Sequence, residues 1–306
     1  MHPPPLRTSQ GSLGPPSLEP PHILYLLQDG FCAASCKFCA LSRLNRRAGR
    51  LGRVEWPRVS AGDLEKLVGR YKAACIQTII KPDYWREALE AAAYLREKGL
   101  SVRVATQPVS PEELKEARSL VDYLGVGLDA FSPRVLVACG KPYPWRRYIG
   151  FIEQAVDVFG EGRVYVHLIA GLGESPEEAL RLLDVLYGLG AKVALFPLVG
   201  LEKPWPTLVD KTYYRRLQVA AGLLNAGLKP GEYLRVAHGE LLPTPAFDDL
   251  PRDIVYSSFL TQGCPGCNRP FYTERPGNMY NYPSRRLLLR DMGEVVEELG
   301  WGPVGR

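Results

Sequence analysis

Short apolar runs alternate with longer amphipathic stretches over residues 23–200. The apolar runs have the length of buried strands, and they lie at 23–27, 75–80, 101–106, 121–128, 164–169 and 192–196. Helical periodicity marks the intervening stretches at 63–72, 85–98, 111–120, 145–159 and 177–189. An alternation of buried strands with amphipathic helices predicts right-handed βαβ units and a parallel sheet.

Two helix starts in this region carry capping signals. Ser110 and Ser175 are each followed by a proline and two glutamates, which predicts a serine N-cap and a proline at the first helical position. The six strand–helix units are fewer than those of a closed (βα)8 barrel. We therefore predict an α/β fold with an incomplete (βα)6 parallel barrel. Its chemistry is expected at the C-terminal ends of the strands.

The two ends of the chain lack this alternation. Residues 1–22 contain seven prolines and almost no apolar periodicity, which predicts a flexible arm. The barrel core is expected over residues 23–204, and a mostly irregular C-terminal extension over residues 205–306.

Within the extension, helices are predicted at 212–225 and 291–299, and a strand at 233–237. Residues 239–285 are rich in Pro, Gly, Tyr and Asn and show little periodicity. A loop of that length inside a compact domain is usually functional.

The composition is that of an ordinary globular protein. Of the 306 residues, 46% are hydrophobic and 23% are charged, which excludes a wholly disordered, collagen-like or coiled-coil chain. No apolar run has the length of a membrane span, and the start lacks a signal-peptide layout. We therefore expect a cytoplasmic protein without membrane association. A net charge of +5 is too small to indicate a nucleic-acid partner by itself.

The seven cysteines suggest metal or catalytic use, because a chain without a secretion signal seldom has a disulfide framework. Cys32, Cys36 and Cys39 form a C-x3-C-x2-C motif after the first predicted strand. Thiolates at this spacing can wrap one soft metal centre. Three of them on a [4Fe–4S] cluster leave one iron open for chemistry. The alternative is a structural zinc site, but zinc usually takes four ligands, and no fourth lies nearby in the sequence.

This motif, with the aromatic Phe38 before its last cysteine, resembles that of the radical S-adenosylmethionine (SAM) superfamily, and the resemblance covers roughly residues 22–200. It implies that the amino and carboxylate groups of SAM chelate the open iron, and that Phe38 is one of the cofactor-binding residues. One electron from the cluster then cleaves the carbon–sulfur bond of SAM. The resulting 5′-deoxyadenosyl radical abstracts a hydrogen atom from the substrate.

Three further segments resemble cofactor-binding segments of the biotin-synthase-like branch of that superfamily. The resemblance assigns the adenine to Ile169, Gly171 and Glu174, the ribose hydroxyls to Asp129, and the methionyl carboxylate to Arg147. A guanidinium suits a carboxylate because it can form a bidentate fork. The alternatives are a solvated acid at the end of a strand for Asp129 and an exposed helical charge for Arg147.

Three other cysteines are candidates for a second iron–sulfur cluster. Cys264 and Cys267 flank a Pro-Gly turn, which can direct two thiolates to one ion. Cys75 lies in the second predicted strand, where biotin-synthase-like proteins have a cysteine that ligates an auxiliary cluster. The alternatives are half a zinc knuckle for the pair and an inert buried thiol for Cys75. We assign Cys139 no role.

The tail from Cys264 to Pro283 resembles archaeal biotin-synthase-related proteins, some of which are components of a two-protein lipoyl synthase. This resemblance implies that sulfur from the second cluster enters an octanoyl chain on a lysine of a carrier protein. It also implies a second radical SAM subunit. The alternatives are another radical SAM transformation (biotin-synthase-like, a rearrangement or a methylation), or an iron–sulfur or zinc binding module without turnover.

Residues 43–58 contain six arginines and one acid, Glu55. Such a stretch suits a docking surface for an acidic partner, either an acidic carrier domain or a flavodoxin- or ferredoxin-type reductant. The alternative is a solvated loop. No pattern of stacking aromatics accompanies the arginines, so no nucleic acid is expected.

Overall fold

The computed structural model describes residues 3–10, 18–199 and 209–301. Its main sheet has the strand order β10-β9-β8-β7-β6-β2-β1-β5. The first six of these strands are parallel to one another. They span β2 (Leu24–Gln28), β6 (Ala73–Gln77), β7 (Ser101–Thr106), β8 (Tyr123–Asp129), β9 (Val164–Ala170) and β10 (Lys192–Pro197). Within the described part of the chain β10 does not pair with β5, so the sheet stays open. The predicted incomplete (βα)6 barrel is confirmed.

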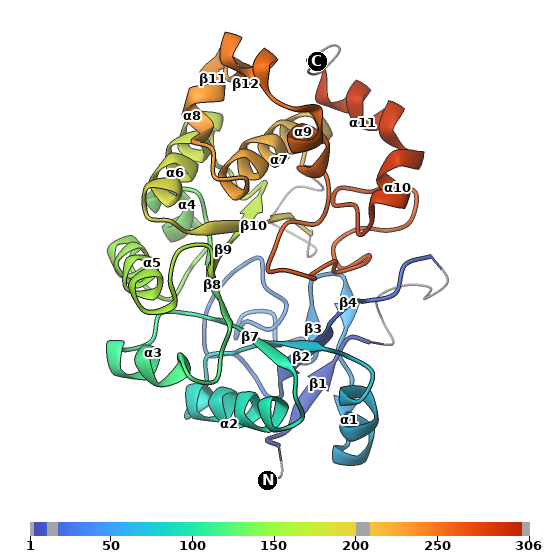
Figure 1. Ribbon diagram of the computed structural model, residues 1–306. Coiled ribbons are helices and arrows are strands. Elements are labelled where there is room, and N and C mark those ends of the chain that lie inside the picture. Colours follow the sequence, from blue (N-terminus) through green and yellow to red (C-terminus); the bar gives the residue numbers. More distant parts are fainter. Residues whose placement is uncertain (1–2, 11–17, 200–208, 302–306) are drawn as a thin grey trace.

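The connecting helices lie along the outer side of the curved sheet (Figure 1). They are α1 (Ala61–Val68), α2 (Tyr84–Glu97), α3 (Pro111–Ala117), α4 (Pro133–Ala138), α5 (Trp145–Phe159) and α6 (Pro176–Gly188). The capping signals are confirmed: Ser110 and Ser175 each accept a bond from the backbone of the third helical residue, a glutamate, whose side chain bonds back to the cap. These caps fix where α3 and α6 begin, and therefore how long the preceding loops at the strand ends are.

The prediction of a flexible arm is wrong for Leu6–Thr8, which form strand β1. This strand pairs antiparallel with β2 and with β5 (Arg58–Val59). Its backbone therefore forms hydrogen bonds with the edge of β2 that the parallel strands leave unpaired. Arg7 forms an ion pair with Asp29 at 2.6 Å. Residues 1–2 and 11–17 of the predicted arm lie outside the described residues. A short hairpin of β3 (Arg50–Leu51) and β4 (Val54–Glu55) follows the loop after β2.

The C-terminal extension contains more regular structure than its sequence predicts. It holds α7 (Lys211–Asn225), α8 (Pro230–Tyr233), β11 (Leu234–Ala237), β12 (Glu240–Pro243), the 3-10 helix η1 (Pro245–Asp249), α9 (Arg252–Ser257), α10 (Arg285–Arg290) and α11 (Met292–Leu299). The predicted helices at α7 and α11 and the strand at β11 are confirmed. The elements that were not predicted have four to six residues each and are too short to show periodicity in the sequence; they are α8, β12, η1, α9 and α10. The domain boundary at residue 204 stays a prediction, because it falls between the described ranges.

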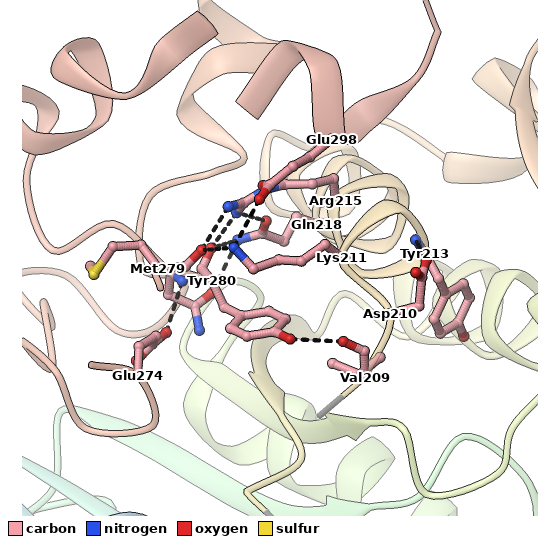
Figure 2. Close-up of polar contacts among 11 residues, drawn as sticks. Val209, Asp210, Lys211, Tyr213, Arg215, Gln218, Glu274, Met279, Tyr280 and Glu298 are labelled. Carbon is pink, nitrogen blue, oxygen red and sulfur yellow. Dashed lines mark hydrogen bonds and ion pairs between the residues drawn. The ribbon is translucent and has the colours of Figure 1, made fainter. Parts of the chain in front are cut away.

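A buried polar network fastens the irregular tail to α7 and α11 (Figure 2). Arg215 is fully buried; it donates to the carbonyls of Met279 and Tyr280 at 2.7 and 2.5 Å and forms an ion pair with Glu298 at 2.7 Å. Lys211 donates to the same Met279 carbonyl at 2.8 Å. Removing one partner of such a buried charged network is costly, so the tail is held in one path.

Among the described helices, none is both long and apolar enough to span a membrane.

Candidate functional site

The inner face of the open barrel and the tail enclose a cavity of about 240 Å³. Six of the seven cysteines line it, namely Cys32, Cys36, Cys39, Cys75, Cys264 and Cys267. We call the first three the loop thiols and the last three the inner thiols. All seven cysteines are free. Segments far apart in the sequence therefore bring six thiols to one cavity.

The loop thiols lie in the segment that follows β2, at the C-terminal end of this strand. The backbone N–H of Cys39 donates to the carbonyl of Cys36 at 3.2 Å, which closes a tight turn between these two ligand candidates. Asn45 fixes the turn from outside, because its side-chain amide donates to the carbonyls of Lys37 and Cys39 at 3.1 and 2.8 Å. The loop is thus ordered by its own hydrogen bonds.

Burial governs the protonation of the loop thiols. It raises the pKa of Cys36 to about 11, against the opposing effect of Lys141. Burial and the neighbouring Cys36 raise the pKa of Cys39 to about 12. These groups are neutral thiols at neutral pH, and a metal centre must displace their protons when it binds.

The inner thiols approach one another from β6 and from the turn at residues 264–267. Burial raises the pKa of Cys264 well above its usual value, and the nearby Cys75 and Cys267 raise it further. The Cys75 sulfur accepts a hydrogen bond from Gln77 at 3.0 Å. The Tyr25 hydroxyl lies 3.6 Å from the Cys267 sulfur. The three thiols therefore form a second group.

Side chains from the barrel interior hold the turn that carries two of the inner thiols. Arg103 on β7 is 6% exposed and donates to the carbonyl of Pro265 at 2.7 Å. The Tyr25 hydroxyl on β2 accepts from the backbone N–H of Arg269 at 2.9 Å. Side chains alternate along a strand, so Arg103 faces the cavity while its neighbours Val102 and Val104 are fully buried in the main core.

A buried ion pair lies on the side of the loop thiols. Lys141 places its amine 2.5 Å from the Asp129 carboxylate and 2.6 Å from the carbonyl of Gly127. Burial disfavours the charge on Lys141, but Asp129, with Tyr148 and Cys36, outweighs this effect and raises the pKa of the amine. Asp129 ends β8 with φ +65° beside an irregularity in the β8–β9 register. Such a break in the ladder re-aims the side chain.

The structure brings together some of the residues assigned to the cofactor and leaves others apart. Phe38, Asp129 and Ile169 line the cavity, whereas Arg147, Gly171 and Glu174 are not among its lining residues. Arg147 is exposed, and its guanidinium lies 4.2 Å from the ring centroid of Tyr143. The Gly171 N–H donates to Glu174 at 2.7 Å, so this glutamate closes its own turn. The SAM-binding roles of these three residues stay predictions without geometric support.

Several cavity residues have no role in the sequence-based assignment. Arg103 and Lys141 are two of them, and Arg269, Tyr272 and His167 are others. Arg103 could have been recognised from the sequence, because it is a charged residue in the middle of an otherwise apolar strand and a buried charge needs a partner. Burial and Arg269 lower the pKa of His167 to about 4, so this imidazole is neutral at neutral pH.

Each thiol group has the chemistry of a ligand set for an iron–sulfur cluster. Within the described ranges, no three His, Cys, Asp or Glu side chains lie close enough to bind one metal ion. A four-iron cluster is larger than one ion, and cysteine thiolates are its usual ligands. Both groups offer three thiols, which would leave one iron of each cluster without a cysteine ligand. The donor sets therefore fit such clusters.

Comparison with known proteins identifies the fold. The sequence model of the Radical SAM superfamily matches residues 30–186. A search of curated protein sequences gives no match. Methylornithine synthase (PylB) is similar in structure, with a TM-score of 0.52 and 11% identity over 66% of this chain. HydG, a maturase of the [FeFe]-hydrogenase, has a TM-score of 0.53 and 11% identity over 67% of this chain. The chain spans 61% and 49% of these two proteins, and at this identity the likeness concerns the fold alone.

Proposed function

The chain belongs to the radical SAM superfamily, whose model covers more than half of it, and on that premise we propose that it inserts sulfur at an unactivated carbon. The proposal places it in the biotin-synthase-related branch, with a lipoyl-synthase-like reaction. Its substrate is an octanoyl chain on a lysine of an acidic carrier protein, and a second radical SAM subunit completes the reaction. One observation carries the proposal: the three inner thiols open onto the same cavity as the three loop thiols.

The loop thiols are the proposed ligands of the catalytic [4Fe–4S] cluster. When bound, this cluster supplies the electron that cleaves SAM to a 5′-deoxyadenosyl radical. The protein contributes the ordered turn, in which Asn45 holds the carbonyls on either side of Phe38. Preorganised ligands lower the cost of ordering when the cluster and SAM bind.

Residues along the cavity wall are the proposed SAM site. Phe38 and Ile169 offer apolar surface, and the Asp129–Lys141 pair offers one acceptor and one cation. The Asp129 carboxylate keeps its assigned role toward the ribose hydroxyls, and the Lys141 ammonium offers a cation to the methionyl carboxylate of SAM. Burial of the Lys141 amine, whose side chain is 1% exposed, keeps water from competing for these bonds.

The inner thiols are the proposed ligands of a second iron–sulfur cluster that serves as the sulfur source. Arg103 and Tyr25 hold the Cys264–Cys267 turn against the barrel interior. The buried network around Arg215 holds the tail that continues from it (Figure 2). Transfer of sulfur to a carbon radical requires contact between the reacting groups. A substrate chain in this cavity would lie beside both thiol groups.

Sulfur labelling tests the proposal. The protein is reconstituted anaerobically with iron and isotope-labelled sulfide, then incubated with SAM, dithionite and an octanoylated carrier domain. Labelled sulfur in the octanoyl chain, with 5′-deoxyadenosine formed alongside, is the expected result. Formation of 5′-deoxyadenosine with hydrogen abstraction but no sulfur in any product would instead favour another radical SAM transformation.

A further inference from the structure

The guanidinium of Arg269 reaches the cavity from the tail and lies over a group of rings. It lies 4.0 Å from the ring centroid of Phe196 on β10. The Phe196 ring contacts His167 on β9 and Tyr272 of the tail, with centroid distances of 5.4 and 6.2 Å. All four residues line the cavity, and we call them the ring site. A cation and three rings from distant segments thus meet at one part of the cavity wall.

We propose that Arg269 binds the acyl oxygen of the substrate, and that the ring site thereby sets how far an acyl chain extends into the cavity. The inference deepens the proposed function and rests on it in one respect: the substrate carries an acyl group. That group is either an amide on a carrier protein or a free carboxylate. Both present an oxygen acceptor that a guanidinium can bind.

The backbone around Arg269 is held in an unusual conformation. Arg269 and Phe271, on either side of Pro270, have φ of +33° and +56°. Such angles are uncommon for residues with a side chain and persist where the surroundings enforce them. The Tyr25 hydroxyl accepts the backbone N–H of Arg269 at 2.9 Å, and the Arg53 guanidinium donates to the next turn residue, at the Phe271 carbonyl, at 2.7 Å. The turn is therefore fixed from two sides with Arg269 directed into the cavity.

Arg269 has more uncommitted donors than the other cations of the cavity. A guanidinium carries five N–H donors, and among the described residues the Arg269 side chain forms one hydrogen bond, to the Gln262 carbonyl at 2.7 Å, and no ion pair. Arg103 donates three hydrogen bonds from its side chain. Lys141 is paired with Asp129 at 2.5 Å. Arg269 is therefore the cation best able to bind a ligand.

The neighbours of Arg269 favour an acyl group over a positively charged ligand. Asp129 is the acidic side chain among the described residues that line the cavity, and Lys141 already engages it. Burial and Arg269 lower the pKa of His167 to about 4, so this imidazole is neutral and can accept a hydrogen bond, for example from an amide N–H. The Phe196 ring offers apolar surface to a hydrocarbon chain.

The ring site lies where the tail closes the open barrel. Phe196 belongs to the last strand of the sheet, which has no further partner among the described strands. On the other side, Trp56 behind the β3–β4 hairpin contacts Tyr272 at a centroid distance of 6.3 Å. The tail thus passes between β10 and this hairpin (Figure 1). A chain tethered to a carrier keeps its acyl end toward the wall of the cavity, and Arg269 is part of that wall.

Arg103 and Arg269 have different places beside the inner thiols. Arg103 donates to the carbonyl of Pro265, which lies between Cys264 and Cys267 in the sequence, so its charge is tied to the thiol-bearing turn. The Arg269 charge is instead held over Phe196. We therefore assign Arg103 to the inner thiols and Arg269 to the substrate, and the test has to separate these two roles.

The test measures ligand binding without turnover. The protein is reconstituted anaerobically, SAM is added and reductant is omitted. Calorimetry then gives the affinities for a peptide bearing octanoyl-lysine, for octanoate, and for octanol, which lacks the acyl oxygen. Arg269→Gln should weaken binding of an acyl ligand roughly tenfold to a hundredfold, whereas octanol binding should change little.

Two further variants make the result specific. Arg269→Lys keeps the charge but loses the planar fork, so its loss of octanoate affinity should be smaller than that of Arg269→Gln. The matched control is Arg275→Gln, which alters an exposed arginine of the same tail outside the cavity lining. It should leave the three affinities as they are in the unmodified protein.

The comparison of ligands decides the outcome. A loss for the octanoyl-lysine peptide supports the proposal with a tethered substrate, and a loss for octanoate alone supports it with a free acid. Unchanged affinities would overturn it. An equal loss for all three ligands, or a fall in iron content with no difference between acyl ligands and octanol, would also overturn it and give Arg269 a structural role. Because no sulfur is transferred here, failure of the proposed sulfur insertion would not affect this result.

Discussion

The two thiol groups of the cavity have different neighbours, and their buried cations show it most clearly. Beside the loop thiols, Lys141 is neutralised by Asp129 at 2.5 Å. Beside the inner thiols, Arg103 bonds to the carbonyl of Pro265, and its Nε finds no acceptor among the described residues. The loop group is thus charge-balanced before any cofactor binds. The inner group has a spare positive charge, which suits a cluster that carries negative thiolate ligands.

The difference also concerns how each group is held. The loop thiols depend on the short hydrogen bonds of one segment, with Asn45 as its clamp. The inner thiols depend on contacts between β6, β7 and a tail fastened through Arg215. We infer that the loop group can assemble with the barrel, whereas the inner group assembles only when the tail docks.

The largest effect is expected at the loop thiols. Changing Cys32, Cys36 and Cys39 to alanine removes every proposed ligand of the catalytic cluster, so 5′-deoxyadenosine formation should stop. The matched control is Cys139→Ala, since Cys139 is fully buried but does not line the cavity. Chromatography of the products measures the outcome. If the triple variant still cleaved SAM, the loop thiols would not be the ligands of the catalytic cluster, and the proposed difference between the loop thiols and the inner thiols would be wrong.

The inner thiols should show the reciprocal pattern. Cys264→Ala/Cys267→Ala should lower the iron content from about eight to about four atoms per chain, as expected for the loss of one of two [4Fe–4S] clusters. SAM cleavage should persist while sulfur insertion ends. Anaerobic iron and sulfide analysis, together with mass spectrometry of the carrier domain, measures both. Thiolated product from this variant would contradict the sulfur-donor role.

Of the two buried cations, Lys141 and Arg103, the loss of Lys141 should destabilise the protein more. Lys141→Met leaves the Asp129 carboxylate without its buried partner, and breaking such a pair costs about 3–5 kcal/mol. Denaturant unfolding of the metal-free protein measures the change. The double variant Asp129→Asn/Lys141→Met should recover part of the loss, because no unpaired charge remains. An additive loss in the double variant would mean that the two groups do not interact.

A smaller change is expected at Arg103, because no acid is left unpaired when it is altered. Arg103→Lys keeps the charge but loses the bond to the Pro265 carbonyl, and a charged hydrogen bond is worth about 1.5–3 kcal/mol. The Cys264–Cys267 turn should loosen, so its thiols should react faster with an alkylating agent. The loop thiols serve as the internal control. Equal acceleration at both groups would show a general loss of packing and no specific role for Arg103.

The contrast between the loop thiols, which one segment holds, and the inner thiols, which distant segments hold, also explains how much could be predicted from the sequence. The barrel follows from periodicity and capping, and its six parallel strands lie close to their predicted positions. The loop thiols were recognisable because one segment holds them all. Lys141 and Arg103 were missed, because their partners, the Asp129 carboxylate and the Pro265 carbonyl, meet them only in the folded chain. Strand β1 was missed because three residues are too few for a pattern.

The smallest effect is expected at Arg147, and it decides which cation serves SAM. Sequence resemblance assigns the methionyl carboxylate to Arg147, but this side chain is exposed over Tyr143 and does not line the cavity. Its loss should remove a cation–π contact worth about 0.5–1 kcal/mol and change the dissociation constant of SAM by less than about threefold. A residue that binds the carboxylate directly would change it roughly tenfold to a hundredfold. Equilibrium binding to Arg147→Ala, with Arg146→Ala as the exposed neighbour control, separates the two. A large loss at Arg147 alone would return the carboxylate to this residue, and Lys141 would keep only its structural pairing with Asp129.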